Sequence, residues 1–291
     1  MRKGLLVILF FYSTHAMSQT FNDWAKLVNW DGVTPWRQYL RYSPGFMGPN
    51  ALPVPEIGNG TVDSINHISV SGVFHFSKGD HTQNIKLRGN YCLVKDFISA
   101  DITWIPIEWF RQSAGIKNER HVYYHGYYDQ KAAGDIYLNV NVQLLSRWRK
   151  YIHLVFRTGF RYPTSSSVGA ARYTDAPGYH FDLSGGIPLS NKFKFTTMTG
   201  FYVWQLNKKG QNDAILFGGG FEYNHKGWRW QTNCRGYSGY LNNGDRPVIV
   251  GSQLEKKSKN ISFLFGLHQG LHDYKYTSIE LGTKYSFAKR K

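Results

Sequence analysis

Two side chains, His75 and Ser77, have the types and spacing of a catalytic pair. Residues two apart on a β-strand lie side by side on one face, and a histidine beside a serine can take its proton and make it a nucleophile. His180, Asp182 and Ser184 repeat this spacing. The alternative is that both sets are polar side chains on the wet face of a sheet. We favour this alternative and predict no enzyme activity.

Disulfide and metal chemistry find little support in the sequence. The chain has two cysteines, Cys92 and Cys234, and neither a Cys-x-x-Cys nor a His-Glu-x-x-His motif. Alternation along the chain predicts that Cys92 faces inward and Cys234 outward, on strands far apart. A disulfide needs Cα atoms within about 7 Å, so no bridge is expected. We predict neither a metal ion nor a cofactor.

The stretch 119–130 contains four tyrosines and two histidines. Tyrosine offers stacking area and a hydroxyl group, which suits a sugar or a protein partner. His121 and His125 could ligate a metal, but no third ligand lies nearby in the sequence. The alternative is a hairpin that extends two strands beyond the sheet, and we favour it over a binding surface.

From residue 64 onward, apolar and polar residues alternate with a period of two, which predicts β-strands. In the segment 134–144, Ile136 and Leu138 share one face while Asp135 and Asn139 share the other, a separation that no helix gives. The polar face also carries charges in mid-strand. Its basic members are Lys86, Arg88, Arg157, Arg161, Arg229 and Arg235, and its acidic members are Asp101, Asp135, Asp182, Glu222 and Glu280.

These inward charges have two interpretations. Arginines along an aqueous path would attract anions and repel cations, because rings of charge set the selectivity of a pore. Alternatively, each arginine pairs with a carboxylate across the interior, since the guanidinium fork matches a carboxylate. The second arrangement fills the interior with hydrogen-bonded charge. The balance between them predicts a narrow or plugged interior, not a wide pore.

The alternation predicts about twelve strands, an even number as in single-chain bacterial barrels. Turns after the even-numbered strands are short, whereas the long loops 109–131 and 163–176 both follow odd-numbered strands. Short turns on the inner side with longer loops outside are typical of outer-membrane barrels. The expected strands are 64–77, 82–94, 97–108, 132–146, 149–162, 177–188, 191–206, 211–224, 227–241, 245–256, 259–271 and 273–288.

Alternation alone would also fit a soluble β-sandwich. Three features favour a transmembrane antiparallel β-barrel over residues 64–291: an outward face that stays apolar, charges on the polar face, and aromatic residues near strand ends. Such aromatic residues form girdles at the two membrane interfaces. The girdle candidates are Trp104, Trp109, Trp148, Tyr162, Tyr179, Trp204, Tyr223, Trp228 and Tyr285.

The first 63 residues differ from the rest. Arg2, Lys3, an apolar run and small residues before Gln19 predict a cleaved signal peptide over 1–18. Residues 19–63 begin with the spacing of a short amphipathic helix and continue with half of the prolines in the chain. Proline lacks the donor that a central strand needs. We therefore expect a Pro/Gly-rich N-terminal segment that is periplasmic, packed in the periplasmic mouth, or a plug in the barrel.

The last strand ends Tyr285-Ser286-Phe287, and this aromatic-x-aromatic ending resembles the insertion signal of outer-membrane β-barrels. The aromatic content is similar to that of barrels from Bacteroidota. The resemblance covers residues 64–288 and implies a Gram-negative outer membrane, with the barrel-assembly machinery as a partner. Other outer-membrane barrels cleave lipids with a similar His-x-Ser pair, but they carry Asn where this chain has Lys78.

The formal net charge is +16. In an exported protein this favours lipopolysaccharide, outer-membrane lipid and anionic solutes over nucleic acid as partners. We therefore predict a narrow outer-membrane channel or transporter for small, anionic solutes. Two alternatives remain: a non-conducting structural subunit that binds envelope proteins, and a lipid-modifying enzyme.

Overall fold

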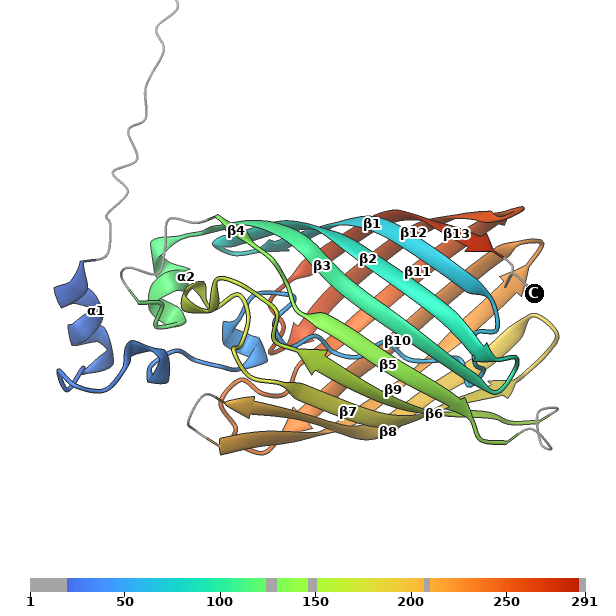
Figure 1. The fold of residues 1–291 in the computed structure, drawn as a ribbon, viewed down its shortest axis with the longest axis horizontal. Helices are drawn as coiled ribbons and strands as arrows, with labels where there is room; N and C mark the ends of the chain where they lie inside the picture. The colour runs from blue at the N-terminus through green and yellow to red at the C-terminus, as the bar shows by residue number, and fades with distance from the viewer. Residues whose placement is uncertain (1–19, 124–129, 146–150, 207–209, 288–291) are drawn as a thin grey trace, which may run out of the picture.

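The computed structural model describes residues 20–123, 130–145, 151–206 and 210–287. Twelve long strands form one antiparallel ring that closes through β1–β13 and β2–β3, with a two-residue strand, β4, paired to β3 (Figure 1). The predicted twelve-stranded antiparallel β-barrel is confirmed. Its strands are β1 Asn66–Ser77, β2 Asp80–Val94, β3 Ile98–Gln112, β4 Lys131–Ala132, β5 Ile136–Gln143, β6 His153–Tyr162, β7 Gly178–Pro188, β8 Phe193–Leu206, β9 Gly210–His225, β10 Trp228–Gly239, β11 Val248–Ser258, β12 Ile261–His272 and β13 Thr277–Phe287.

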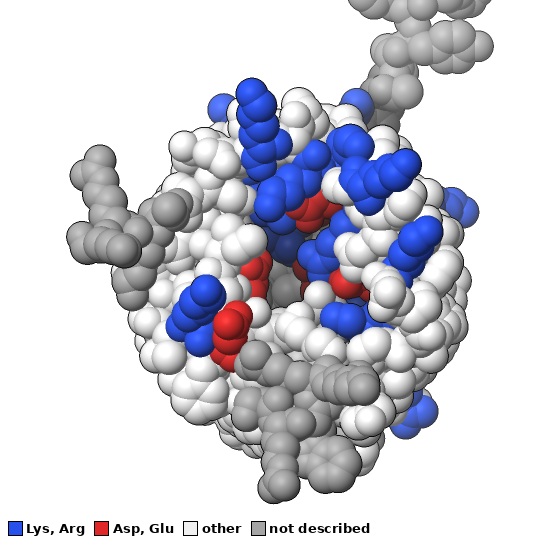
Figure 2. Space-filling view, turned by 90° about the vertical axis from the view of Figure 1, so that its right-hand side faces the viewer, with Lys and Arg blue, Asp and Glu red and all other residues white. Residues whose placement is uncertain are grey.

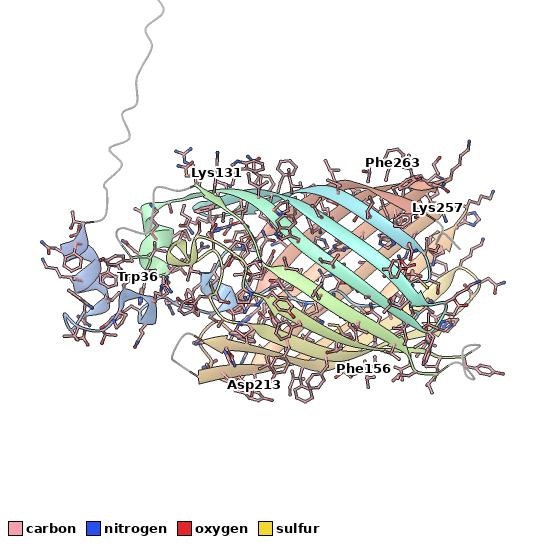
Figure 3. All side chains as sticks on the ribbon, in the orientation of Figure 1. Trp36, Lys131, Phe156, Asp213, Lys257 and Phe263 are labelled. Atoms are coloured by element: carbon pink, nitrogen blue, oxygen red, sulfur yellow. The ribbon has the colours of Figure 1, made fainter. Side chains whose placement is uncertain are left out.

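Alternation along the strands puts apolar side chains outside and polar ones inside. Ile68 and Val70 on β1 are 55% and 51% exposed, whereas Ser69 and Ser71 between them are 6% and 2% exposed. Phe263 on the outer wall is 58% exposed (Figure 3). This pattern is the reverse of a soluble protein and suits a barrel surrounded by lipid.

The two ends of the barrel differ, and we name them for their connections. At the turn end, strands are joined by short turns such as 226–227 and 259–260, and β13 also finishes there. At the loop end lie the longer connections, including 163–177 and the α-helix α2, Ala114–Glu119 (Figure 1). Longer loops mark the outer face of such barrels. The turn end therefore faces the periplasm.

The N-terminal part begins outside the barrel at the loop end. Helix α1, Phe21–Val28, starts at Thr20, whose side chain accepts a hydrogen bond from the Asp23 backbone. The hydrogen bonds from Thr20 lower the pKa of Asp23. Trp24 on this helix donates from Nε1 to the carbonyl oxygen of His121, which follows α2, at 3.3 Å. The helix thus lies over the long loops, at the end opposite to the periplasmic mouth that the sequence suggested as one possible site.

Residues 40–63, which we name the lumen segment, then pass through the inside of the barrel to the turn end (Figure 1). Gly45 N donates to Gly244 O in a loop-end connection at 2.9 Å. Farther along, the Leu52 carbonyl accepts from Tyr237 Oη on β10 at 2.9 Å, and Val62 N donates to Gln143 at the start of a turn-end connection at 3.0 Å. The lumen segment therefore crosses the barrel once, before the first strand begins. The 3₁₀ turn Trp36–Gln38 precedes the lumen segment, and the 3₁₀ turn Pro44–Phe46 lies near its start.

An apolar core fills the loop-end half of the interior. Leu40, Met47 and Leu52 of the lumen segment pack with the inward aromatic side chains of β8 and β10. One of these is Trp204, which is fully buried. The expectation that Trp204 belongs to a lipid-facing girdle was wrong, because it shares the inward face of β8 with Met198 and Tyr202. Burial of such side chains contributes about 1.5–3 kcal/mol each.

Strand boundaries differ from the expected ones mainly at the loop end. Strand β3 continues to Gln112, past the expected end at 108, and α2 and a third 3₁₀ turn, Val168–Ala170, occupy parts of the loops that follow β3 and β6. The proposed hairpin or binding surface at 119–130 lies largely outside the described residues, since 124–129 are not among them. Trp148 and residues 1–18, with the expected signal peptide, also lie outside them. Within the described chain, no helix is long and apolar enough to cross a membrane.

Candidate functional site

The inner wall of the barrel carries all the charged residues that alternation predicted to face inward. Six of them are buried: Asp135, Arg161, Asp182, Glu222, Arg235 and Glu280. The other five line the cavities of the lumen: Lys86, Arg88, Asp101, Arg157 and Arg229. Their positions follow from strand geometry, because residues two apart share a face. Their partners, which decide what each charge can do, come from several strands and from the lumen segment.

A buried ionic cluster closes the loop end. Arg172 donates from Nε to Glu108 and from Nη1 to Asp80, both at 2.7 Å, and all three side chains are fully buried. Arg120, beyond α2, donates to the same oxygen of Asp80 at 2.6 Å. Burial lowers the pKa of Arg172, but Glu108 and Asp80 outweigh it and raise this pKa above its usual range. Arg172 thus stays charged and binds two strands to the loop 163–177.

Sequence reasoning missed this cluster. Glu108 is the last residue of the strand expected at 97–108, so its inward orientation could have been inferred. Asp80 was expected in the turn between residues 77 and 82, whereas the structure makes it the first residue of β2. Arg120 and Arg172 lie in connections without any periodic pattern, so the sequence offered no signal for them. The cluster also fixes the lumen segment, because Asn50 donates from Nδ2 to Glu108 Oε2 at 2.6 Å.

Arginines from the wall hold the backbone of the lumen segment. Arg161 donates to Asp135 at 3.1 Å and to the carbonyl oxygen of Ala51 at 3.3 Å. Arg157 donates from Nε to Asp182 at 2.7 Å and from Nη2 to the carbonyl oxygen of Glu56 at 2.8 Å. Each arginine therefore neutralises a carboxylate of the wall and binds a carbonyl of the segment. This matches the interpretation in which inward charges pair.

Three more pairs of predicted inward charges lie between mid-barrel and the turn end, where Lys284 also binds Glu255. The Glu56 carboxylate of the lumen segment accepts from both terminal nitrogens of Arg88. Lys86 binds Glu280 across strands. Arg229 binds Glu222 at 2.7 Å, and Asn59 also donates to Glu222.

Two of the charges predicted to face inward remain without an ionic partner among the described residues. Asp101 accepts hydrogen bonds from the amides of Asn139 and Asn141, at 2.6 and 2.8 Å. The Arg235 guanidinium donates to the Asn233 side chain at 2.7 Å, and no carboxylate lies within ion-pair distance of it. Their strands, β3 and β10, lie on opposite sides of the ring.

A chamber of about 410 Å³ lies beside the lumen segment in mid-barrel. Its walls include Lys86, Arg88, Arg235 and Glu280 together with segment residues around Glu56. A second cavity of about 900 Å³ lies at the turn end and shares several wall residues with the chamber, among them Arg88 and Glu56. Figure 2 looks into this end, where Lys and Arg side chains surround a hollow that also contains acidic groups. The interior is thus hollow towards the periplasm and packed at the loop end.

The residues considered for catalysis are held in other arrangements. The ring of His75 is 5% exposed; its Nδ1 lies 2.7 Å from Ser278 Oγ and its Nε2 lies 3.0 Å from Asn84 Oδ1. Both ring nitrogens of His75 therefore have partners other than Ser77. In the second set, Ser184 donates to Asp182, which also accepts from Arg157. Ser184 thus hydrogen-bonds the carboxylate directly, without a histidine between them.

The described residues include no group of three or more His, Cys, Asp or Glu side chains that could hold a metal ion. Cys92 is buried and Cys234 is exposed, and both are free thiols, in agreement with their expected orientations. At the end of β13, Tyr285 and Phe287 point outward, 48% and 39% exposed, with their rings stacked.

Comparison with solved structures finds channels of similar fold. The COG4313 outer membrane channel from Pseudomonas putida F1 has a TM-score of 0.59 and 10% identity, over 81% of this chain and 100% of that chain. The NanC porin has a TM-score of 0.52 and 10% identity, over 76% of this chain and 100% of that one. The KdgM porin in complex with disordered oligogalacturonate has a TM-score of 0.50 and 11% identity, over 76% and 99%. No family model and no curated protein matches this sequence.

The chain has the fold of an outer-membrane β-barrel. A closed antiparallel sheet pairs its backbone N–H and C=O groups between strands and leaves no edge unpaired in the lipid. The apolar exterior suits contact with lipid. Fold and exterior together place the protein in the outer membrane, as the sequence predicted.

Proposed function

We propose that this protein is a narrow outer-membrane channel for small, anionic solutes. The observation that carries the proposal is the mid-barrel chamber, which lies next to a hollow turn end. Five lysine and arginine side chains stand in its wall: Lys86, Arg88, Arg157, Arg161 and Arg235. A cavity of about 300–1,000 Å³ suits a small ligand. Basic walls and a net charge of +16 favour anions.

The loop end must open for a solute to pass. There the lumen segment packs against Trp204 and Tyr237, and the Arg172 cluster closes the remaining space. Nearer the turn end the segment is held by polar contacts, such as Gly58 N to Ser184 Oγ at 3.3 Å. Polar contacts beside water break more readily than buried apolar contacts, because water can replace either partner of the hydrogen bond. We infer that conduction requires the lumen segment to shift within the barrel.

A disulfide that fixes the lumen segment to the wall tests this proposal. A Cβ atom built on Gly58 lies 3.0 Å from Ser184 Cβ, and a disulfide needs about 3.5–4.5 Å, which a small shift provides. Gly58→Cys with Ser184→Cys is made in a background in which Cys92 and Cys234 are replaced by Ser. We expect single-channel conductance in planar bilayers to be small when the bridge is oxidised and to rise at least severalfold on reduction.

The control is the same background with Gly58→Cys alone, whose conductance should not respond to the reductant. Conductance that is equal with and without the bridge would contradict movement of the segment. If neither form conducts, while the purified barrel is folded, the channel proposal fails. A closed barrel that co-purifies with envelope proteins would then favour a structural subunit.

We also propose that the barrel is not an enzyme. The support is the pairing of both His75 ring nitrogens with Ser278 and Asn84, which leaves Ser77 without an activating base at that histidine. The similar solved structures are a channel and porins. Phospholipid hydrolysis by the purified protein that disappears in Ser77→Ala would contradict this assignment.

A further inference from the structure

Of the six basic residues predicted to face inward, Arg235 alone lacks an ionic partner in the described chain. Lys194, a further inward lysine on β8, donates to the carbonyl oxygen of Asn59 at 3.4 Å. Among the residues that the structure describes, Lys86, Arg88, Arg157, Arg161 and Arg229 each bind a carboxylate. Arg235 is 5% exposed and donates only from Nη1, to the Asn233 amide oxygen, while its Nε has no hydrogen-bond partner. The Nε–Nη2 edge, which is the edge that Arg229 uses toward Glu222, is thus without an acceptor in the described chain.

A buried charge without a partner is costly, and sites that keep one are candidates for ligand binding. The acids that line the chamber together with Arg235 are already engaged. Glu56 accepts from both terminal nitrogens of Arg88, and Asp101 stands on the opposite side of the ring with its oxygens bonded to amides. No described carboxylate therefore forms an ion pair with Arg235.

A second donor lies beside Arg235. His268 on β12 lines the same chamber, and its buried Nδ1 has no hydrogen-bond partner. Between them is Gly251 on β11. A Cβ there would lie 2.5 Å from His268 Nδ1 and 3.3 Å from Arg235 Nη1, so both groups lie close to the same bare piece of wall. Only a residue without a side chain leaves room for the two polar groups to approach each other.

The chamber surface next to this pair is mixed in character. Ile249 and Tyr274 line it together with Arg235 and His268. Small-molecule sites commonly combine apolar walls with a few convergent polar groups. One guanidinium with a free edge matches one carboxylate, whereas a doubly charged anion would bring more negative charge than one partner-free arginine offsets.

We propose that Arg235 and His268 form a binding subsite for the carboxylate of a small solute in mid-barrel. The subsite rests on the proposed function in that it names the group by which an anionic solute is held in the lumen. Arg235 takes the carboxylate through its free edge, and His268 contributes a ring nitrogen to the same group. Ile249 and Tyr274 adjoin the remainder of the solute.

Acetate titration of the purified mature protein in detergent tests the subsite without requiring conduction. The probe is sodium acetate against sodium chloride at equal ionic strength, followed by NMR of the arginine Nε–H groups. The Arg235 signal is assigned by its loss in Arg235→Lys. We expect a saturable shift of that signal and an apparent Kd that rises about tenfold or more in His268→Asn, as expected for loss of a hydrogen bond to a charged group.

Arg229→Gln is the matched control, since Arg229 lies on the same strand and face but binds Glu222 at the turn end. It should leave the acetate Kd unchanged. An Arg235 signal that does not shift with acetate, or an unchanged Kd in His268→Asn, overturns the subsite even if the channel conducts. A saturable shift in a barrel that never conducts retains the subsite and overturns the channel.

Discussion

Ion pairing decides which charged residues hold this barrel together and which are available to a solute. Arg172 binds Asp80 and Glu108 where no side chain of the three is exposed. Such a pair stabilises through its geometry, and removal of one partner leaves an uncompensated buried charge. Arg235 has only an amide as a partner in the described chain. The two arginines therefore have different tasks despite similar burial.

This difference predicts the effect of removing the buried arginine. Arg172→Met leaves Asp80 with Arg120 alone and Glu108 without its arginine, and we expect a loss of about 3–5 kcal/mol in the free energy of unfolding. The measurement is urea unfolding of the mature barrel in detergent. The control is Arg37→Met, whose pair with Asp175 is half-exposed and should change stability by about 1 kcal/mol or less. Equal effects of the two variants would contradict a structural role for the cluster.

At the residue scale, the sequence predicted orientation but not partnership. Alternation placed Arg157 and Glu280 on the inner wall because orientation follows from a period of two. It could not show that Glu56 binds Arg88, since Glu56 lies in a segment without periodicity. Nor could it separate Arg235 from the other basic residues, because that distinction depends on contacts among strands far apart in the chain.

At the element scale, the lumen segment is the feature that distinguishes this barrel. Twelve strands return the chain to its starting side, and one more crossing through the interior puts the two ends of the described chain on opposite faces. Helix α1 therefore lies on the side of the long loops, over Tyr39 and Tyr123. The strands and the short helix were readable from periodicity. The direction of the segment was not, since it depends on contacts with loops.

This topology predicts that the N-terminal helix is accessible from outside the cell. An epitope inserted between Gln19 and Thr20 should be labelled by antibody on intact cells, because the chain reaches the loop end before it enters the lumen. The matched control is the same epitope after Lys291, which should be labelled only in permeabilised cells. Labelling of the N-terminal epitope only after permeabilisation would contradict the direction of the lumen segment.

The last strand carries a second element-scale prediction, which concerns assembly. Phe287 on β13 lies on the outer wall beside Tyr285, and we propose that the barrel-assembly machinery binds this ending. Phe287→Ala should lower the amount of heat-modifiable barrel in the outer membrane severalfold. Phe263→Ala is the control, since Phe263 on β12 is also a lipid-facing phenylalanine, 58% exposed against 39% for Phe287. Similar losses in both variants would show a general effect of lipid-facing area.

At the scale of the whole molecule, packing and charge are distributed unevenly along the barrel axis. The loop-end half contains the apolar core and the fully buried Arg172 cluster, whereas the turn-end half is hollow and basic (Figure 2). A solute that enters from the turn end reaches Arg235 before it reaches the packed region. The sequence predicted a narrow interior but could not show which end is closed, because the closing residues come from the loops and the lumen segment.

The most direct test of this account is the reversal potential of the mature protein in a planar bilayer under a potassium chloride gradient. We expect a potential of the sign that marks chloride as the preferred ion, and a shift towards zero in Arg235→Ser. Arg157 is already paired with Asp182. We therefore expect Arg157→Ser to lower the free energy of unfolding and to change the reversal potential less than Arg235→Ser does. A cation-selective wild-type barrel, or a reversal potential that Arg235→Ser leaves unchanged, would contradict an anion path past Arg235.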